Sequence, residues 1–461
     1  MSQSSPPSVP PAAPASPPKR GVLIRTPIPG PKARDVIERD RKFLMTTTKT
    51  APIVAESGAG VWITDVDGNR LLDFSSGVGV AAVGYAHPDV VRAVRDQVGR
   101  LSHFAGTDYY YDVQVRLAER ILRFIPGEFE KKVFFTNSGT ESAEAALKIA
   151  RWHRQRPITL GLLGAFHGRT MGALTMTTSK IVQRGRYDAF AGGGHHIPAP
   201  YCYRCPYQLQ YPSCDLYCAK ILKELYFQTS IPPDDVAAMI VEPVLGEGGY
   251  IVPPPGWHRT IKSILDEHGI LFIDDEVQAG IGRTGRWLAI EHHGVVPDIV
   301  TMAKALGGGL PLGAVAFRAD LDFPVSGAHS NTFGGNLVAA AASLATLEVL
   351  EKDRLLDNAR VQGAYLLERL RELAQRHEEI GDVRGLGLMT ATEFVRDRRT
   401  KEPHVVFRDR VLVESYKRGL ILLPCGRSTL RYIPPLVVRR EEIDEGIEIL
   451  DAAIAAARAQ E

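Results

Sequence analysis

The sequence predicts an α/β protein in which helices cover a mostly parallel sheet, joined to a smaller α/β domain from the N-terminal segment and the C-terminal third. Short runs that are apolar on both faces alternate with helical patterns along the middle of the chain. Strands of this kind are typical of parallel sheets buried on both sides. From about residue 338 the pattern becomes mainly helical. With 461 residues, the chain is long enough for two or three domains.

The composition excludes several classes of protein. The 55 basic and 53 acidic residues give a formal net charge of +2, and no basic block predicts a nucleic-acid partner. No stretch approaches the roughly 20 apolar residues of a membrane span, so no membrane partner is expected. Five cysteines are too few for a disulfide framework in a chain of this size. We therefore expect a cytoplasmic protein.

The N-terminal part is expected to form a tail followed by an arm. Residues 1–20 are rich in Pro, Ser and Ala, which predicts a disordered tail, and they lack the basic start and apolar core of a secretory signal. Residues 21–85 are predicted to form an arm and a hairpin. The hairpin is VWITDVDGNRLLDFS, in which DVDGNR forms the turn between two β-rich runs.

Residues 86–335 are predicted to form the large domain. Its expected strands are KVFFTN, ITLGLLGAF, AAMIVEPV, ILFIDDEV, DIVTMAKAL and GAVAFR. Helical patterns such as ESAEAALKIARWHRQ and PGWHRTIKSILDEHG lie between them. Residues 336–461 are predicted to form the small C-terminal domain, which begins with long helices and ends with the helix EEIDEGIEILDAAIAAARA.

Polar clusters follow five of the expected strands. Ligands of open α/β sheets bind at the carboxyl ends of the strands, so these clusters predict one common site. The clusters are Ser138-Gly139-Thr140, Phe166-His167-Gly168-Arg169-Thr170, Glu242-Pro243, Asp275-Glu276-Val277-Gln278 and Lys304.

Three of these clusters suit parts of one cofactor. Ser138, Gly139 and Thr140 precede a helix, where backbone N–H groups and the helix dipole can hold a phosphate, although such a segment is more often only a cap. Asp275 could cap a helix, but an ionised carboxylate is also what keeps a pyridine nitrogen protonated. Val277 could then pack on the ring, and Gln278 could reach a phenolic oxygen.

Lys304 ends an apolar strand, where a lysine is costly unless it has a function. A lone lysine there more often extends its amine to the surface. A desolvated amine, however, has a lowered pKa and forms Schiff bases with carbonyls. Taken together with the other strand-end clusters, Lys304 predicts a pyridoxal 5′-phosphate enzyme, and this residue and Asp275 are the predicted catalytic residues.

The motifs in these clusters resemble those of a known family. NSGTESAEAALKIAR, AFHGRT, EPVLGEGG, DDEVQAGIGRTG, AKALGGGLPLGA and NTFGGN occur in the order and spacing of the class III aminotransferases. These are pyridoxal-phosphate enzymes of fold type I that include 4-aminobutyrate, ornithine and acetylornithine aminotransferases. The resemblance covers nearly the whole folded chain, and it implies an amino donor and a 2-oxo acid as small-molecule partners.

The resemblance also implies residue roles. Lys304 resembles the lysine that binds the cofactor and moves the proton, and Asp275 resembles the partner of the pyridine nitrogen. Thr332 resembles the residue that reaches the phosphate from a second subunit, which implies a homodimer or a higher homo-oligomer. The full expected set of cofactor-binding residues is Ser138, Gly139, Thr140, Phe166 (stacked on the ring), His167, Asp275, Val277, Gln278, Lys304 and Thr332.

Four further residues are expected to bind the substrate. Arg169 resembles an arginine that binds a distal carboxylate, and Arg431 resembles the one that binds the α-carboxylate of glutamate. Glu242 is assigned as the glutamate that pairs with Arg431 when an ω-amine occupies the site, and Asn331 of NTFGGN completes the set. This pattern predicts an ω-aminotransferase that uses 2-oxoglutarate as acceptor and 4-aminobutyrate, ornithine or a similar amine as donor.

Three departures from the family pattern affect the expected substrate. Leu245 replaces a usual Gln, Leu337 replaces a usual Pro, and the arm segment TTTKTAP lacks the expected aromatic and arginine residues. A less polar pocket edge is therefore expected. Racemisation of amino acids by the same lysine chemistry is an alternative, and a non-catalytic regulatory protein that binds pyridoxal phosphate is a second one.

An insertion at residues 201–218 carries four cysteines. Cys202, Cys205, Cys214 and Cys218 have the spacing C-x2-C-x8-C-x3-C. Four thiolates could complete a tetrahedral zinc site, but the second pair and the short loop are less typical of one. Reduced thiols packed among tyrosines are the favoured interpretation, so no metal is predicted and the cysteines are alternative candidates.

Overall fold

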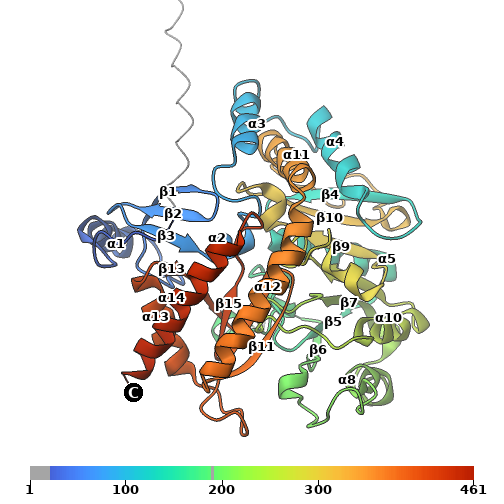
Figure 1. The fold of residues 1–461 in the computed structure, drawn as a ribbon. Coiled ribbons are helices and arrows are strands. Elements are labelled where there is room, and N and C mark those ends of the chain that lie inside the picture. Colours follow the sequence, from blue (N-terminus) through green and yellow to red (C-terminus); the bar gives the residue numbers. More distant parts are fainter. Residues whose placement is uncertain (1–20, 188–191, 461) are drawn as a thin grey trace, which may run out of the picture.

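The structure of the protein is a computed structural model that describes residues 21–187 and 192–460. The predicted tail at residues 1–20 lies outside this range. The larger part of the molecule is built around a seven-stranded sheet of order β4-β10-β9-β8-β7-β5-β6 (Figure 1). Its strands are β4 (Lys131–Thr136), β5 (Ile158–Leu162), β6 (Gly194–Ile197), β7 (Val236–Val241), β8 (Leu271–Asp275), β9 (Ile299–Met302) and β10 (Gly313–Arg318).

The six strands expected from the sequence are all present. The run from β6 through β5, β7 and β8 to β9 is parallel, whereas β10 pairs antiparallel with both β9 and β4. The extra strand β6, with the sequence GHHI, was not predicted. It is short and lies at the edge of the sheet next to β5, so it lacks the apolar run that marks the central strands.

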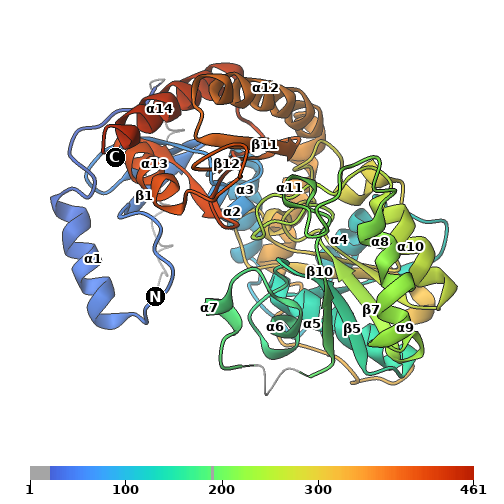
Figure 2. The ribbon, with the colours of Figure 1, turned by 90° about the horizontal axis from the view of Figure 1, so that it is seen from below.

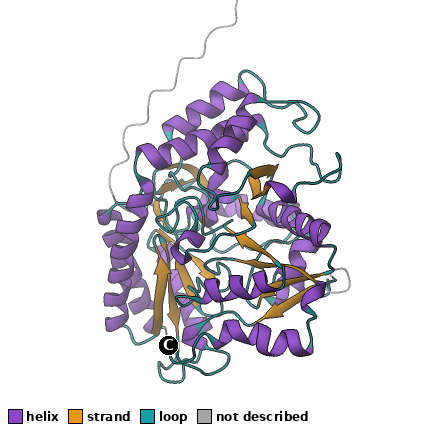
Figure 3. Ribbon diagram, turned by 90° about the vertical axis from the view of Figure 1, so that its right-hand side faces the viewer, coloured by secondary structure: helices purple, strands orange, loops and turns teal. Residues whose placement is uncertain are grey.

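The central strands are buried because helices cover both faces of the sheet. Alternate residues of β7 belong to different core clusters. Ala238 and Ile240 pack with α5 (Gly139–Arg154), whereas Met239 and Val241 lie in the core that includes α10 (Trp257–Glu267). Figure 3 shows helices around the sheet. This arrangement explains why every residue of β7 is apolar and buried.

The predicted N-terminal hairpin is also present. The strands β2 (Trp62–Asp65) and β3 (Arg70–Asp73) pair antiparallel, and β1 (Ala55–Ala59) adds to β2 after α1 (Pro31–Phe43). On its other side β3 pairs with β13 (Leu420–Ile421), a strand from the C-terminal third. The N-terminal segment and the C-terminal third therefore share one sheet, as the sequence predicted for the smaller part of the fold.

A second small sheet has the order β11-β12-β15-β14 and is antiparallel throughout. Its strands are β11 (Ile380–Leu386), β12 (Met389–Phe394), β14 (Leu423–Cys425) and β15 (Thr429–Tyr432). The helices α12 (Leu355–Arg376), α13 (Val405–Lys417) and α14 (Arg440–Arg458) lie beside it (Figure 2). This sheet positions Arg431, which lies on β15.

The remaining helices are shorter or connect the two parts. The helix α11 (Leu337–Lys352) packs on α3 (Pro88–Val98) and α4 (Asp112–Leu122). The others are α2 (Ser76–Gly79), α6 (Met171–Met176), α7 (Ile181–Arg184), α8 (Tyr217–Ile221) and α9 (Phe227–Thr229). Within residues 21–187 and 192–460, none of the helices has the length and apolar character needed to cross a membrane.

Candidate active site

A cavity of about 480 Å³ lies at the carboxyl ends of the parallel strands. It brings together residues from five strand ends that are far apart in the sequence. The predicted site residues that line it are Ser138, Gly139, Thr140, Phe166, His167, Arg169, Glu242, Asp275, Val277, Gln278 and Lys304. The single common site inferred from the polar clusters is therefore present as a geometric feature, because parallel strands end at the same edge.

A buried ion pair lies inside this cavity. Asp275 ends β8, and its Oδ2 is 2.6 Å from His167 Nδ1. Its Oδ1 accepts a hydrogen bond from the Val277 N–H, and both charged side chains are almost fully buried. Burial alone would lower the pKa of His167, but the hydrogen bond and charge of Asp275 outweigh it and raise this pKa. The contact with Asp275 thus favours the charged form of His167.

Lys304 lies two residues after the end of β9 and has a φ of 47°. This left-handed conformation is uncommon for a residue with a side chain and is often found at functional sites. Burial lowers the pKa of its amine, although Asp275 and Glu242 act in the opposite direction. A lysine with a lowered pKa is more often present as the uncharged nucleophile.

The N-terminus of α5 also lines the cavity. Ser138 caps this helix of 16 residues by accepting a hydrogen bond from the Glu141 N–H. Gly139 approaches Val277 so closely that an added Cβ would lie 2.7 Å from Val277 Cγ1. The Thr140 hydroxyl accepts hydrogen bonds from the Arg169 and Thr170 N–H groups. These contacts join the helix start to the loop after β5.

Glu242 has a structural position different from the predicted one. Its Oε1 accepts a hydrogen bond from the Phe166 N–H and its Oε2 accepts one from the Gly246 N–H, both at 2.9 Å. Burial raises the pKa of Glu242 to about 7. Because both oxygens are bound to backbone groups, Glu242 holds the loops after β5 and β7 together and does not pair with Arg431.

The partner of Arg431 is Glu247, which the sequence analysis did not identify. Arg431 Nη1 lies 2.6 Å from Glu247 Oε1, and the arginine side chain is only 6% exposed. Burial alone would raise the pKa of Glu247, but the charges of Arg431 and Lys180 hold it below its usual value. The predicted arginine–glutamate pair therefore exists with a different glutamate. Glu247 belongs to the same EPVLGEGG motif, but the direction of a side chain in a turn cannot be read from spacing alone.

Gln278 connects this ion pair to the cavity. Its Oε1 accepts hydrogen bonds from the Tyr250 hydroxyl at 2.8 Å and from Arg431 Nη1 at 3.3 Å. Tyr250 is fully buried and was not predicted as a site residue. Since the Gln278 oxygen is bound to these two donors, its amide N–H groups remain the part that can bind a ligand.

Three of the predicted residues do not line the cavity: Arg431, which contacts the lining residue Gln278, and Asn331 and Thr332. Asn331 does not line the cavity, because its amide donates to the Phe135 carbonyl and accepts from the Gly334 N–H. These hydrogen bonds hold the loop at residues 331–334, and the predicted substrate contact of Asn331 stays a prediction. Thr332 is exposed and lines a separate surface hollow with Gly106 and Thr107. By contrast, Arg169 lines the cavity, and its guanidinium lies 5.9 Å from the centre of the Phe166 ring.

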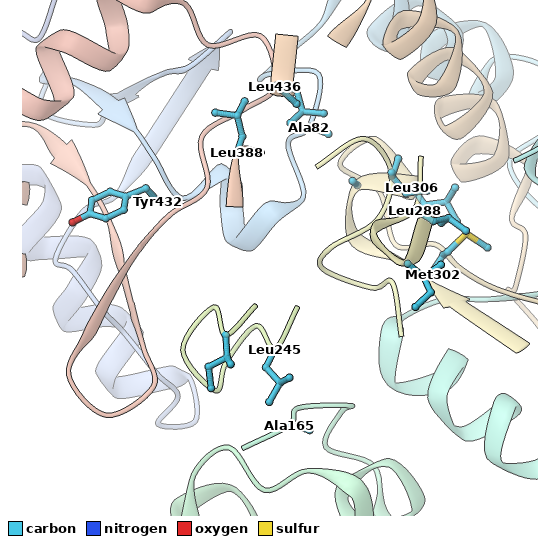
Figure 4. Packing of buried hydrophobic residues seen from close by; sticks show 14 of the residues in the cluster. Ala82, Ala165, Leu245, Leu288, Met302, Leu306, Leu388, Tyr432 and Leu436 are labelled. Atoms are coloured by element: carbon cyan, nitrogen blue, oxygen red, sulfur yellow. The ribbon is translucent and has the colours of Figure 1, made fainter. Parts of the chain in front are cut away.

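Leu245 does not form the less polar pocket edge that the sequence predicted. Its side chain is fully buried in the main hydrophobic core and lies beside Ala165 (Figure 4). Its backbone pairs with Ile251 across the turn that carries Glu247. The replacement of Gln by Leu at this position therefore contributes to packing behind the site and does not change the lining of the cavity.

The four cysteines at residues 202–218 line one small hollow and are all free thiols. Burial raises the pKa of Cys202, and burial raises the pKa of Cys218 to about 12. In the part of the chain that the structure describes, no group of three or more His, Cys, Asp or Glu residues is arranged to hold a metal.

Comparison with known proteins now identifies the family. The sequence model of the class III aminotransferases matches residues 44–454. The chain belongs to this family. It is 39% identical to a leucine/methionine racemase of Thermococcus litoralis over 92% of this chain and 96% of that protein. It is 38% identical to a 5-aminovalerate aminotransferase of Pseudomonas aeruginosa over 87% of this chain and 92% of that protein.

Solved structures agree with the fold. An amine transaminase from an uncultivated Pseudomonas species, in its PLP-bound form, has a TM-score of 0.83 and 32% identity. The match covers 90% of this chain and 99% of that chain. The fold is therefore that of the fold type I transaminases, and this class III enzyme depends on pyridoxal 5′-phosphate.

The residues that line the cavity fit this cofactor. The start of α5 offers backbone N–H groups for a phosphate. The absence of a Cβ at Gly139 allows this helix start to pack against Val277. Asp275 presents a buried carboxylate suited to a pyridinium nitrogen, and Lys304 presents an amine of lowered pKa. The buried Nε2 of His167 has no hydrogen-bond partner among the described residues, so it too is free to bind a ligand.

Proposed function

We propose that this enzyme transfers the amino group of an ω-amino acid to a 2-oxo acid such as 2-oxoglutarate. The donors that fit are 4-aminobutyrate, 5-aminovalerate and ornithine, whose reacting amine lies far from a carboxylate. The observation that carries this proposal is the ion pair between Arg431 and Glu247, at 2.6 Å, which Gln278 connects to the cavity. A relative of this chain is a 5-aminovalerate aminotransferase, which supports the same class of donor.

The ion pair suits an enzyme with two kinds of substrate. An ω-amine brings no carboxylate to Arg431, so without Glu247 the buried guanidinium would be left unpaired, which is costly. L-glutamate brings an α-carboxylate that takes the place of Glu247. In the proposed scheme Arg169, at the cavity wall, binds the distal carboxylate in both cases.

The chain's own residues then perform the remaining steps. When bound, pyridoxal phosphate withdraws electrons from the substrate carbon that loses its proton. Lys304 Nζ holds the cofactor and moves this proton, since its lowered pKa leaves the amine able to accept one. Asp275, fixed by His167 and the Val277 N–H, keeps the pyridine nitrogen protonated. Glu242 keeps the loops around the ring in place.

A homodimer is part of the proposal. Thr332 is exposed and lies outside the cavity of its own chain, which supports its predicted contact with the phosphate bound by a second subunit. Exposed aromatic side chains offer apolar area for such an interface: Phe333 is next to Thr332 in the sequence, and Phe104 and Tyr109 flank Gly106 and Thr107, which line the same hollow.

The test is a set of half-reactions followed by the visible absorbance of the bound cofactor. The donors are 4-aminobutyrate, 5-aminovalerate, L-ornithine and L-glutamate, and Lys304→Ala serves as the inactive control. We expect L-glutamate and at least one ω-amino acid to react. The Glu247→Gln variant should lower kcat/KM about tenfold for the ω-amino acid while sparing L-glutamate, since roughly 1.4 kcal/mol corresponds to tenfold. Failure of every ω-amino acid to react would overturn the proposal.

A second candidate is an amino-acid racemase. The observation that favours it is the 39% identity to a leucine/methionine racemase, which is close to the 38% identity to the aminotransferase. The two functions differ in their products. Incubation with L-leucine or L-methionine in the absence of any 2-oxo acid, followed by chiral chromatography, separates them, because a racemase forms the D-enantiomer without an acceptor.

A further inference from the structure

The carboxylate of Glu247 lies between two cations. Its Oε1 is 2.6 Å from Arg431 Nη1, and its Oε2 is 3.6 Å from Lys180 Nζ. The two cations differ in position, since the side chain of Arg431 is 6% exposed and that of Lys180 is 38% exposed. Arg431 is thus buried next to Gln278, which lines the cavity, and Lys180, which precedes α7, is closer to solvent. The Glu247 carboxylate therefore contacts one buried cation, Arg431, and one more exposed cation, Lys180.

The backbone around Glu247 is held at several points. The Gly246 N–H donates to Glu242 Oε2 at 2.9 Å, and the Gly426 N–H donates to the Glu247 carbonyl at 2.8 Å. The guanidinium of Arg384 donates to the Gly249 carbonyl at 2.9 and 2.6 Å. With the turn fixed in this way, a change of partner by Glu247 requires only rotation of its side chain.

Arg384 is itself firmly anchored. It forms ion pairs with Asp382 at 2.6 Å and with Glu393 at 2.9 Å, and only 11% of its side chain is exposed. Glu393 also accepts hydrogen bonds from Tyr201 and Arg204 of the cysteine-containing segment. The anchor of the turn thus involves both the large and the small sheet regions, and the turn has little freedom to follow the carboxylate.

Displacement of Glu247 from Arg431 is costly without a second cation. The Glu247 side chain is only 15% exposed, and a largely buried carboxylate without a partner costs several kcal/mol. Neutralisation by a proton is disfavoured as well, because the two cations hold the pKa of Glu247 below its usual value against the effect of burial. A nearby cation that is already in contact with the other carboxylate oxygen removes this difficulty.

We propose that Lys180 is a positioning residue that receives the Glu247 carboxylate when the α-carboxylate of a substrate binds Arg431. This inference rests on the proposed exchange of substrates at Arg431. In the ω-amine reaction Glu247 pairs chiefly with Arg431, and in the glutamate reaction it pairs chiefly with Lys180. Lys180 acts through Glu247 and does not itself contact the α-carboxylate. Lys180 therefore lowers the free-energy cost of binding L-glutamate and not that of binding the ω-amine.

The experiment compares Lys180→Met with the wild-type holoenzyme. For L-glutamate we expect KM to rise about three- to tenfold with kcat within twofold, a range that corresponds to a partly exposed ion pair. For the ω-amino acid donor we expect KM to be unchanged or slightly lower. Lys220→Met is the matched control, since this lysine is 39% exposed and pairs with Asp215 on the surface. It should change neither constant.

A double-mutant cycle separates this role from direct binding of substrate. In a Glu247→Gln background, Lys180→Met should have no further effect on KM for L-glutamate. A direct contact with substrate would persist in that background, and a contact with the distal carboxylate of the donor would raise KM for the ω-amino acid. Either result overturns the inference.

Binding without turnover provides an independent measurement. The dissociation constant of glutarate, an unreactive dicarboxylate, should rise in Lys180→Met by the same factor as KM for L-glutamate, as measured by calorimetry. Equal binding to the variant and to the wild type would overturn the inference. The proposed function fails separately, when the wild type reacts with no ω-amine, and the glutamate and glutarate measurements still apply in that case.

Discussion

His167 Nδ1 and Asp275 Oδ2 are 2.6 Å apart in the interior of the site, with 0% and 3% of the two side chains exposed. The two residues come from different strand ends and lie 108 positions apart in the sequence. Their contact fixes the orientation of the carboxylate that faces the cofactor cavity. Because this contact raises the pKa of His167, the free energy of unfolding of the cofactor-free enzyme depends on the protonation of His167.

The first prediction concerns this linkage. The pKa of His167 in the folded state is raised above 6.5, so its charge stabilises the fold fully below pH 6.5. That contribution is lost as the pH rises through the raised folded-state pKa. The variant His167→Asn can keep an N–H donor toward Asp275 but cannot be charged. The advantage of the wild type in free energy of unfolding, measured by urea denaturation of the cofactor-free enzyme, should therefore shrink with rising pH. A constant difference would contradict this.

The second prediction concerns Gly139. Alanine normally stabilises a helix more than glycine does. Here, however, the added Cβ would lie 2.7 Å from Val277 Cγ1. Overpacking of this kind costs about 1–3 kcal/mol, so Gly139→Ala should weaken cofactor binding roughly five- to 150-fold, as measured by equilibrium dialysis. Adding Val277→Ala should restore part of the affinity, with Val277→Ala alone as the reference. Unchanged affinity in Gly139→Ala would show that the helix start can shift.

The third prediction concerns Thr332. If its hydroxyl completes the phosphate site of a second subunit, Thr332→Ala should weaken cofactor binding about tenfold, the usual effect of losing a hydrogen bond to a charged group. Ser330→Ala is the control, because Ser330 is exposed and lines the same surface hollow. Light scattering should report a dimer for the wild type and both variants. A monomeric wild type that binds the cofactor with full affinity would refute the dimer.

The fourth prediction concerns the four cysteines of residues 202–218. Protein purified without added zinc should contain no stoichiometric metal by mass spectrometry, and treatment with a chelator should leave its thermal midpoint unchanged. The reason is that, among the residues that the structure describes, no group of three or more His, Cys, Asp or Glu side chains is arranged to hold a metal. All five thiols should react with a thiol reagent after denaturation under anaerobic conditions. One zinc per chain, with loss of stability on chelation, would reverse this conclusion.

Much of the fold could be predicted from local pattern. Strands such as AAMIV and ILFID are apolar on both faces, and this property depends on the sequence alone. The missed strand β6 has the sequence GHHI and forms because β5 offers it a partner. The antiparallel direction of β10 is likewise a matter of pairing, since an apolar run has the same composition in either direction.

The motif EPVLGEGG shows most clearly what the sequence determined and what only the tertiary structure decided. The sequence alone determined that Glu242, Asp275 and Lys304 lie at the ends of buried strands, because polar residues directly after apolar runs can be recognised in it. Since parallel strands end at the same edge of a sheet, it also predicted that these residues gather there. Only the tertiary structure decided that Glu247, and not Glu242, faces Arg431. The Gly246 N–H in the turn between them and the Phe166 N–H in the loop after β5 occupy the two oxygens of Glu242. Arg431 lies on β15, much later in the chain, and pairs with Glu247. Side-chain direction in a turn depends on such distant partners, so tertiary contacts and not local spacing assign the carboxylate that opposes the arginine.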